Sequence, residues 1–465
     1  MCPKIRDAWY YPPDIANDLN DITQLPERLK QEAYACAWEY TRCVIPQYTN
    51  WGRYVAFMRI IIMGIIAEFR GDLVDVTAGD CILGYSLDGT LAELFEGTPG
   101  HALMAREYKT FLLVTADKSS SRRDGELFRR YVNALAISPR VWFRMRDCDA
   151  LARFTMASAL ACNDLDDVWP TDQQFELLAE IGDTLYDAVA FYKHRSEGET
   201  NSTFAYVPLD IRIKAFGVAR EVLWAIDVAY AHKPEGAPLM NFVRFFGGPI
   251  HLMMRRYRFV EEDLTVGRPE TEAVVTETRR NVKLWNRVDA DIHGVNKKAP
   301  TIEIPGVQRY HALLKRSEEL MFPELPEFLE RGGKPYCDRC LYRVSYGAEQ
   351  NHCFGGVGLC LGCRAMWRGY VEALPERAKE AFPDIVLKEP PAPEADGPTA
   401  EVKEKRLKNS RSMNNGNYSF SNGNGVRDHH TTDRIPRLPD GSAPLLDVDH
   451  AELAVPAALR ETIVE

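Results

Sequence analysis

Residues 150–162 form a run that is apolar on almost every side when it is drawn as a helix. A helix without a polar face must be enclosed by other elements, so the run predicts a buried helix inside a large domain. Polar or acidic residues follow at once, at Asn163, Asp164, Asp166 and Asp167. Carboxylates there would meet the negative end of the helix dipole, and burying them is costly without a cation. We therefore expect a divalent metal at this place, and magnesium is favoured because it prefers oxygen ligands.

A second acidic row lies on the helix that the capping box at residues 171–174 begins. Its carboxylates recur at helical spacing and share one side: Glu176, Glu180, Asp183 and Asp187. Such a row is usually a solvated face. For the first cluster the structural alternative is a network of ion pairs with nearby arginines: Arg144, Arg146 and Arg153.

We predict that the two rows bind magnesium across a cavity and act in catalysis. The first row would supply Asn163, Asp164 and Asp167 from one helix face. The second row would supply Asp183 and Asp187. We expect Asp166 to matter less, because it points further around the predicted helix.

Basic clusters accompany the acids. Guanidinium groups bind two phosphate oxygens at once, and metal ions neutralise the remaining charge. Together the clusters predict a diphosphate site, although each alone is more often a surface charge run. The expected substrate-binding residues are Arg130, Lys193, Arg255 and Arg258. The expected catalytic residues from the same part of the chain as Arg255 are Arg256 and Tyr257.

Helical periodicity dominates the chain up to about residue 331, without an alternating strand pattern. Helices are expected at 23–45, 52–70, 101–118, 124–136, 146–164, 172–195, 208–231, 239–261, 268–288 and 308–331. The pattern predicts an all-α domain at 1–331 that is large enough for a central cavity. Most aromatic residues in these helices should pack in the core, and a few could face a carbocation.

Two Cys-x-x-Cys pairs, Cys337 with Cys340 and Cys360 with Cys363, predict a structural zinc site. Four thiolates complete the coordination of the metal, so this site should stabilise the fold and should not bind substrate. His352 and Cys353 are the alternative ligands. The pairs predict a small zinc-binding module at 332–388 that depends on its metal for folding.

Residues 389–465 are rich in Pro, Asn, Ser and Gly and predict a disordered tail. The net charge of −10 argues against a nucleic-acid partner. A secretory signal is not evident, and no apolar run is long enough to span a membrane. The crowding of cysteines in metal-like spacing fits a reducing compartment. We therefore expect a soluble protein in the cytoplasm.

Several long strings of the sequence resemble the fungal alpha-ionylideneethane synthases, which are sesquiterpene cyclases of abscisic acid biosynthesis. The strings include residues 8–19, 35–71, 124–136, 143–167 and 180–206, and the resemblance covers residues 8–385. It implies a terpene-synthase-like helical fold. It also implies that farnesyl diphosphate is converted to alpha-ionylideneethane by metal-assisted loss of diphosphate, a linear farnesene-type intermediate and ring closure.

The chain departs from ordinary class I terpene cyclases, because their Asp-Asp-x-x-Asp motif is absent. Their second metal motif begins here as Asn163-Asp164, but Asp167 and Thr171 stand where it has Ser or Thr and Glu. The pair at residues 256–257 is similar to the late Arg-Tyr pair of those enzymes. The competing hypothesis is a non-catalytic adaptor, in which the zinc module and the tail recruit partners around an inert helical domain.

Overall fold

A computed structural model describes the protein at residues 9–191, 194, 199–253, 304–343, 346 and 354–387. The chain divides into a unit at 1–388 and a second unit at 389–465, and all described residues belong to the first. The predicted tail and the predicted helix at 268–288 lie outside the described residues. The proposed division at residue 331 stays a prediction.

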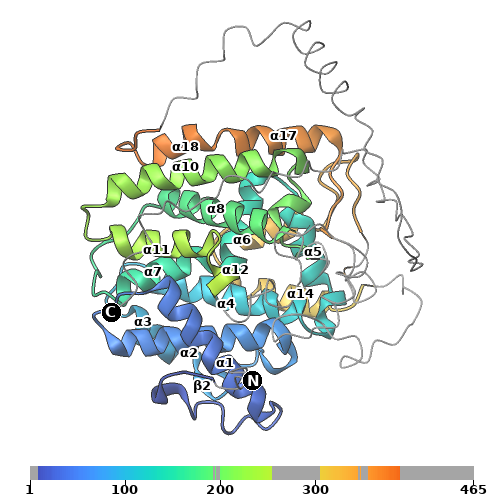
Figure 1. The fold of residues 1–465 in the computed structure, drawn as a ribbon. Helices are drawn as coiled ribbons and strands as arrows, with labels where there is room; N and C mark the ends of the chain where they lie inside the picture. The colour runs from blue at the N-terminus through green and yellow to red at the C-terminus, as the bar shows by residue number, and fades with distance from the viewer. Residues whose placement is uncertain are drawn as a thin grey trace, which may run out of the picture. The chain divides into compact units, whose positions relative to one another are not determined.

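The described part of the chain is mostly helical, which confirms the predicted fold class (Figure 1). Its β-structure is one short hairpin and an isolated bridge between Leu341 and Gly358. The hairpin pairs β1 (Cys81–Ile82) with β2 (Tyr85–Ser86). The first helices are α1 (Glu27–Val44), α2 (Trp51–Phe69), α3 (Leu87–Phe95), α4 (His101–Lys118), α5 (Glu126–Leu135), α6 (Pro139–Ala150) and α7 (Ala152–Ala161). They are followed by α8 (Asp172–Val189), α10 (Arg212–Tyr230), α11 (Gly236–Phe246), α12 (Ile250–Met253), α14 (Val307–Leu314), α15 (Ser317–Leu320), α16 (Leu325–Arg331), α17 (Leu361–Glu372) and α18 (Leu374–Ala381).

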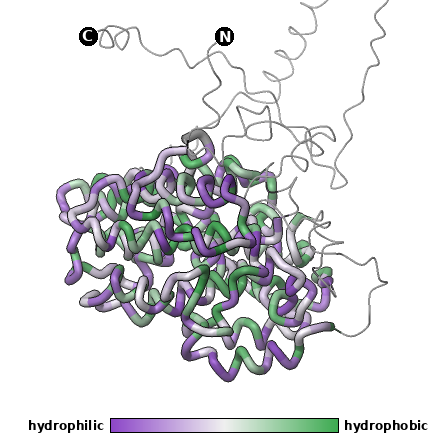
Figure 2. Tube along the Cα trace, turned by 90° about the horizontal axis from the view of Figure 1, so that it is seen from below, coloured by the Kyte–Doolittle hydropathy of each residue, from purple (hydrophilic) through white to green (hydrophobic). Residues whose placement is uncertain are grey.

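Helix α2 illustrates how the core is built. Its sequence is apolar on nearly every side, and all its residues from Tyr54 to Ala67 are buried apart from Arg59. Neighbouring helices α1, α3 and α4 pack around it. At its start the Asn50 side chain accepts a hydrogen bond from the backbone N–H of Arg53, which caps the helix. Most other helices alternate between apolar and polar residues, as Figure 2 shows, because they have one buried side.

The predicted helix at 146–164 is wrong as a single element. It breaks at Leu151, whose φ of 53° is left-handed, and α6 ends before it while α7 begins after it. The break is held by Asp147, whose carboxylate accepts a 2.8 Å hydrogen bond from the backbone N–H of Arg153. This bond satisfies one of the unpaired donors at the start of α7 and offsets part of the strain at Leu151.

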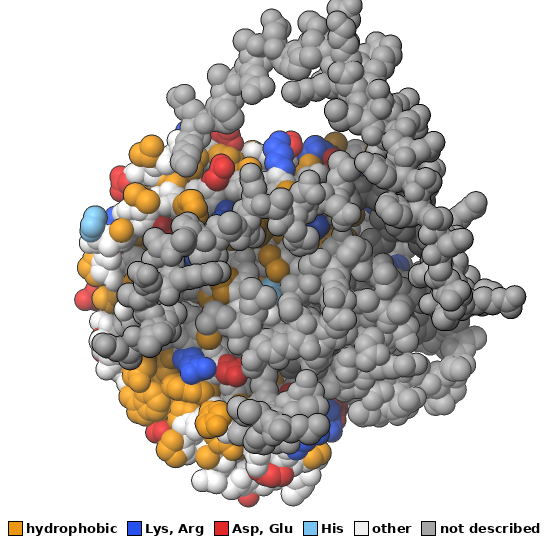
Figure 3. Space-filling model, in the orientation of Figure 1, with side chains coloured by type: hydrophobic (Ala, Val, Ile, Leu, Met, Phe, Trp, Pro, Cys, Tyr) orange, Lys and Arg blue, Asp and Glu red, His pale blue; other side chains and the backbone are white. Residues whose placement is uncertain are grey.

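The segment after residue 304 packs closely on the earlier helices. Helix α16 contacts α5, while α17 and α18 lie along α6, α8 and α10 (Figure 1). Trp367 of α17 is fully buried, and its ring lies 5.5 Å from that of Tyr206 and 5.9 Å from that of Trp142. Hydrophobic side chains gather at the lower left of the face in Figure 3 among scattered charged ones. Among the described helices, none is long and apolar enough to cross a membrane.

Candidate active site and metal centre

The predicted first acidic row lies on a turn and not on a helix. Helix α7 ends at Ala161, and Asp164 adopts a left-handed φ of 53°. Its carboxylate accepts hydrogen bonds from the Thr49 hydroxyl at 2.5 Å and from the Asn50 amide at 3.0 Å. The bond from Thr49, followed by that from Asn50, lowers the pKa of Asp164. The turn is therefore fastened to the start of α2.

Asp166 is bound more firmly than its neighbours in this turn. Arg53 donates to both of its carboxylate oxygens, at 2.5 and 3.0 Å. Arg53 also donates to the carbonyl oxygens of Ala161 and Glu96, each at 2.9 Å. The turn directs Asp166 towards Arg53 of α2, and the expectation that it matters less than its neighbours for the metal stays a prediction. Asp167 is exposed.

The shared helix face expected for Asn163, Asp164 and Asp167 does not exist, because the helix has already ended. Asn163 donates from its side-chain amide to the carbonyl oxygens of Gln47 and Ala159, each at 2.8 Å. The structural alternative, an ion-paired cluster, describes this turn better, although its arginine is Arg53. The magnesium role of the three residues stays a prediction.

Helix α8 carries a row of three buried carboxyl groups. Glu180, Asp183 and Asp187 are 3%, 0% and 0% exposed, so the solvated face that such a row usually forms is absent here. Arg377 of α18 donates to both oxygens of Glu180 at 2.5 and 2.6 Å. Arg146 of α6 donates to Asp187 at 2.9 Å. The two ends of the row are therefore ion-paired to different elements.

Arg146 is the centre of a larger buried cluster. It also donates to Asp149 at 2.7 Å, and its guanidinium lies 5.7 Å from the ring centre of Tyr186. The backbone N–H and the hydroxyl of Thr203 both donate to Asp187 at 2.7 Å. Asp187 is thus surrounded by donors, as a buried carboxylate requires.

Lys118 extends this cluster towards the segment after residue 199. Its ammonium group lies 3.5 Å from Asp149 and 3.7 Å from Glu199. Burial alone would raise the pKa of Glu199, but the nearby Lys118 and His194 hold it well below its ordinary range. The cluster therefore joins α4, α6 and α8 through charges of both signs.

Asp183 differs from its neighbours in the row. Neither of its carboxylate oxygens has a hydrogen-bond partner among the described residues. Burial is the main cause that raises the pKa of Asp183 well above its ordinary value, Arg146 opposes this effect, and the negative charge of Asp187 adds to it. Burial without a hydrogen-bond partner therefore favours the protonated form of this carboxyl group.

These contacts speak against the predicted magnesium row at Asp183 and Asp187. Asp187 is committed to Arg146 and Thr203. In the part of the chain that the structure describes, the one set of three or more metal-ligating side chains close enough to share an ion is formed by cysteines. A buried ion pair with Arg146 thus accounts for Asp187, although the sequence predicted such a network only for the first cluster.

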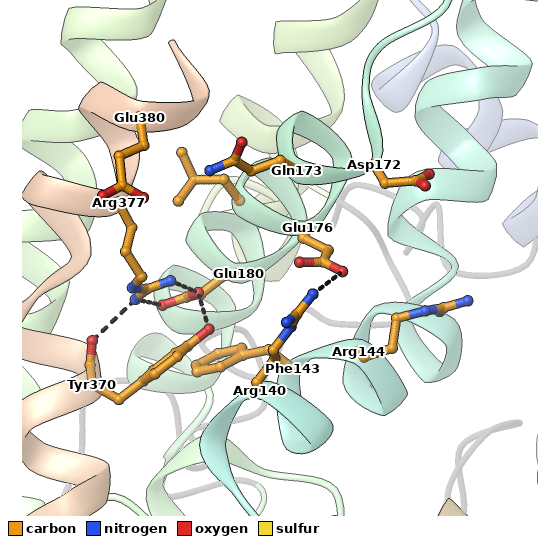
Figure 4. Close-up of a pocket in the computed structure, with 11 residues that line it drawn as sticks. Arg140, Phe143, Arg144, Asp172, Gln173, Glu176, Glu180, Tyr370, Arg377 and Glu380 are labelled. Carbon is orange, nitrogen blue, oxygen red and sulfur yellow. Dashed lines mark hydrogen bonds and ion pairs between the residues drawn. The ribbon is translucent and has the colours of Figure 1, made fainter. Parts of the chain in front are cut away.

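A pocket of about 490 Å³ lies along the first half of α8 and is lined by residues of α6, α8, α17 and α18 (Figure 4). Glu180, Arg377 and Tyr370 form one wall, and the Tyr370 hydroxyl donates to Glu180 at 3.2 Å. At the opposite wall Arg140 lies 3.6 Å from Glu176. Because charged side chains line much of the pocket, it does not suit a hydrocarbon chain and is not the predicted central cavity, which stays a prediction.

The four cysteines of the predicted zinc site come together. The sulfur atoms of Cys337, Cys340, Cys360 and Cys363 lie within 4.8 Å of one another. Cys360 precedes the first residue of α17, and its backbone N–H donates to the sulfur of Cys340 at 3.4 Å. The backbone N–H of Cys363 is the main cause that lowers the pKa of Cys360 to about 7. Four sulfur ligands at this spacing fit a tetrahedral zinc ion.

The other predicted substrate-binding residues divide into two groups. Arg130 is committed elsewhere, because it donates to Glu126 at 2.6 Å and to Glu330 at 3.0 Å and covers the ring of Tyr310. This arrangement joins α5 to α14 and α16 and speaks against a diphosphate contact. Five predicted residues lie outside the described residues: Lys193, Arg255, Arg256, Tyr257 and Arg258. The alternative zinc ligands His352 and Cys353 lie outside them too.

Sequence reasoning missed several members of the buried cluster. Lys118 and Glu199 stand alone in the sequence, and no spacing marks them. Asp149 did carry a signal, because it follows Arg146 by one helical turn at the start of the apolar run. Arg53 could have been suspected as a charge near the start of the apolar α2.

Comparisons with known proteins agree on one family. The profile of a family described as alpha-ionylideneethane synthase aba3 matches residues 7–384. A protein named alpha-ionylideneethane synthase abl3, from Pyricularia oryzae (strain Y34), is 66% identical over 445 residues, which cover 84% of this chain and 86% of that protein. A protein named alpha-ionylideneethane synthase aba3, from Botryotinia fuckeliana (strain B05.10), is 71% identical over 380 residues, which cover 82% and 84%.

Proposed function

Because the chain belongs to the alpha-ionylideneethane synthase family, we propose that it is itself an alpha-ionylideneethane synthase that acts on farnesyl diphosphate. The observation that carries the proposal is the identity of 66–71% with synthases so named over more than four fifths of the chain. The buried cluster, the acidic turn and the four cysteines all lie within residues 7–384, which the family profile matches.

The proposed reaction breaks the bond between the farnesyl carbon and the diphosphate, closes a ring and releases a hydrocarbon. When bound, magnesium would neutralise the charge that develops on the diphosphate. We propose that the diphosphate and its metal are bound by the residues predicted from the sequence, except Arg130, Asp183 and Asp187. The remaining residues are Asn163, Asp164, Asp167, Lys193, Arg255, Arg256, Tyr257 and Arg258. Substituting Arg256 by Ala tests this set, and equal KM and kcat values for the variant and the parent would remove Arg256 from it.

The four-cysteine centre supports a second, structural metal. Thiolates select zinc, whereas carboxylates select magnesium. A four-thiolate site has no open coordination position for a substrate oxygen. We therefore propose that Cys337, Cys340, Cys360 and Cys363 hold zinc and stabilise the segment that α17 and α18 form. From the same cysteine usage we propose a cytoplasmic location.

Incubation of the purified protein with farnesyl diphosphate and magnesium chloride tests the proposal. We expect stoichiometric release of inorganic diphosphate and a C15 hydrocarbon in the mass spectrum. If neither product forms, the non-catalytic adaptor hypothesis gains support. The family's named synthases favour the enzyme, and no described contact favours the adaptor.

A further inference from the structure

The buried row on α8 lacks one positive charge. Glu180 is paired with Arg377 and Asp187 with Arg146, whereas Asp183 between them has no hydrogen-bond partner among the described residues. An ionised carboxylate in such a place would cost several kcal/mol. A proton on Asp183 removes that cost, so the row is complete when Asp183 is a neutral carboxylic acid.

Among the described residues, the surroundings of Asp183 offer it no other cation. Arg146 already binds Asp149 and Asp187, and Asp147 is taken by Arg153. The charged groups that act on Asp183 from the elements around it are Arg146, Asp147 and Asp149 of α6 and Asp187 of α8. Three of these four are negative, so they disfavour ionisation of Asp183.

Aromatic rings pack against the residues of α8 on either side of this acid in the sequence. A side chain at Gly182 would meet Phe246 at 3.4 Å and Phe242 at 3.9 Å. The ring of Tyr186 stacks on that of Phe246 with 4.4 Å between centres. Aromatic faces of this kind suit a hydrocarbon and stabilise a nearby positive charge. The part of α8 that carries Asp183 therefore also carries rings that tolerate a carbocation.

Ring closure in the proposed reaction needs such a proton. In a farnesyl chain the distal double bond joins a CH carbon to a carbon with two methyl groups. In the ionylidene ring the first carbon is a CH2 group and the second is the ring carbon with two methyl groups. The CH carbon must therefore gain a hydrogen before or as the ring forms.

We propose that Asp183 is the general acid that protonates this distal double bond for ring closure, an inference that rests on the proposed function. The O–H bond of Asp183 breaks, and the electron pair of the double bond forms the new C–H bond. The carbon with two methyl groups becomes cationic, and the next double bond supplies the electron pair for the ring C–C bond.

The resulting ring cation loses a proton from a neighbouring carbon, which leaves the ring double bond. This proton returns to the Asp183 carboxylate and exchanges with water between turnovers, so the acid is regenerated. The C15 hydrocarbon that has lost diphosphate is isomerised in these steps, and no oxidant or reductant is required.

The test compares Asp183→Asn with Asp183→Glu by two separate readouts, the release of inorganic diphosphate and the hydrocarbon profile. For Asp183→Asn we expect diphosphate release with linear hydrocarbon, and a fall of about 100-fold or more in the ratio of cyclic to linear product. Asp183→Glu keeps a proton and should recover part of the cyclic product. With the parent in D2O, the cyclic hydrocarbon should carry one deuterium in the ring.

Asp187→Asn is the matched control, because it removes a carboxylate of the same row that is ion-paired. We expect it to lower stability and turnover without changing the product ratio. If Asp183→Asn stays folded and loses diphosphate release, or keeps the parent's product ratio, the acid assignment is overturned. If Asp183→Asn does not fold, the D2O experiment decides, since a ring without deuterium also overturns the assignment. Failure of the parent to release diphosphate would contradict the proposed function instead.

Discussion

Arg377 of α18 donates to both carboxylate oxygens of Glu180 on α8. The guanidinium also lies 3.8 Å from the ring centre of Tyr370 and donates to the carbonyl oxygen of that residue at 3.0 Å. The donor side of this contact follows the four-cysteine centre in the chain. The acceptor lies one helical turn before Asp183. The contact thus connects the metal centre to the helix that carries the proposed acid.

Substituting Arg377 by Met should destabilise the protein by about 3–5 kcal/mol, because Glu180 would stay buried without its partner. Urea unfolding measures this loss. The double variant Arg377→Met with Glu180→Gln should be more stable than Arg377→Met alone, since the buried charge is gone. If the single variant unfolds at the same urea concentration as the parent, the contact contributes little.

Replacing Cys360 by Ser should lower the melting temperature and reduce bound zinc by one equivalent per chain, because one of four thiolates is lost. Metal analysis and thermal unfolding measure the two effects. Cys81 is exposed and stands outside the centre, so Cys81→Ser is the control and should change neither quantity. A Cys360→Ser protein that keeps its zinc would show that the ligand set is wrong.

Two substitutions at the acidic turn test a structural role and a catalytic role separately. Arg53→Ala removes four hydrogen bonds to Asp166, Ala161 and Glu96, and we expect a loss of about 1–3 kcal/mol of stability. Asp167→Asn changes an exposed carboxylate and should leave stability unchanged. If Asp167 binds magnesium as proposed, its substitution should still slow turnover about 100-fold. Near-parent turnover with unchanged dependence on magnesium would remove Asp167 from the metal site.

The pH dependence of stability should report the protonation of Asp183. Its pKa is raised in the folded protein, so unfolding releases a proton. The contribution of Asp183 to stability is therefore complete below its unfolded pKa of about 3.9 and is lost as the pH rises through its folded pKa. Asp183→Asn cannot titrate there. Its stability relative to the parent should grow with pH across this window, by at most about 1.4 kcal/mol per unit, as measured by urea unfolding.

Most helices could be predicted from the sequence, because burial of one side imposes a regular spacing of apolar residues. The break between α6 and α7 could not, since Leu151 is neither Gly nor Pro and nothing local marks a left-handed residue there. It depends on the bond between Asp147 and the N–H of Arg153, which exists only once the chain has folded. Because the predicted helix continued to residue 164, the acidic residues at its end were expected on a helix face, whereas they lie on a turn.

Parts of the candidate site could be predicted only where the residues that interact are close in the sequence. The four cysteines form two close pairs, so their chemistry is visible in the sequence. The partners of the α8 carboxyl groups come from distant parts of the chain: Arg146 for Asp187 and Arg377 for Glu180. Spacing along α8 revealed the row of acids but could not tell which members were paired. That distinction singles out Asp183.

The contact between Glu180 and Arg377 also bears on how the chain folds during synthesis. Helix α8 leaves the ribosome long before α18, so Glu180 stays unpaired until Arg377, 197 residues further along the chain, has been made. Trp142 and Tyr206 likewise wait for Trp367 to cover them. Contacts so far apart in sequence slow folding and expose apolar surface in the meantime. The segment of α17 and α18 therefore acts as a late closing step, and nascent or truncated chains that end before Arg377 should be the ones that depend most on chaperones.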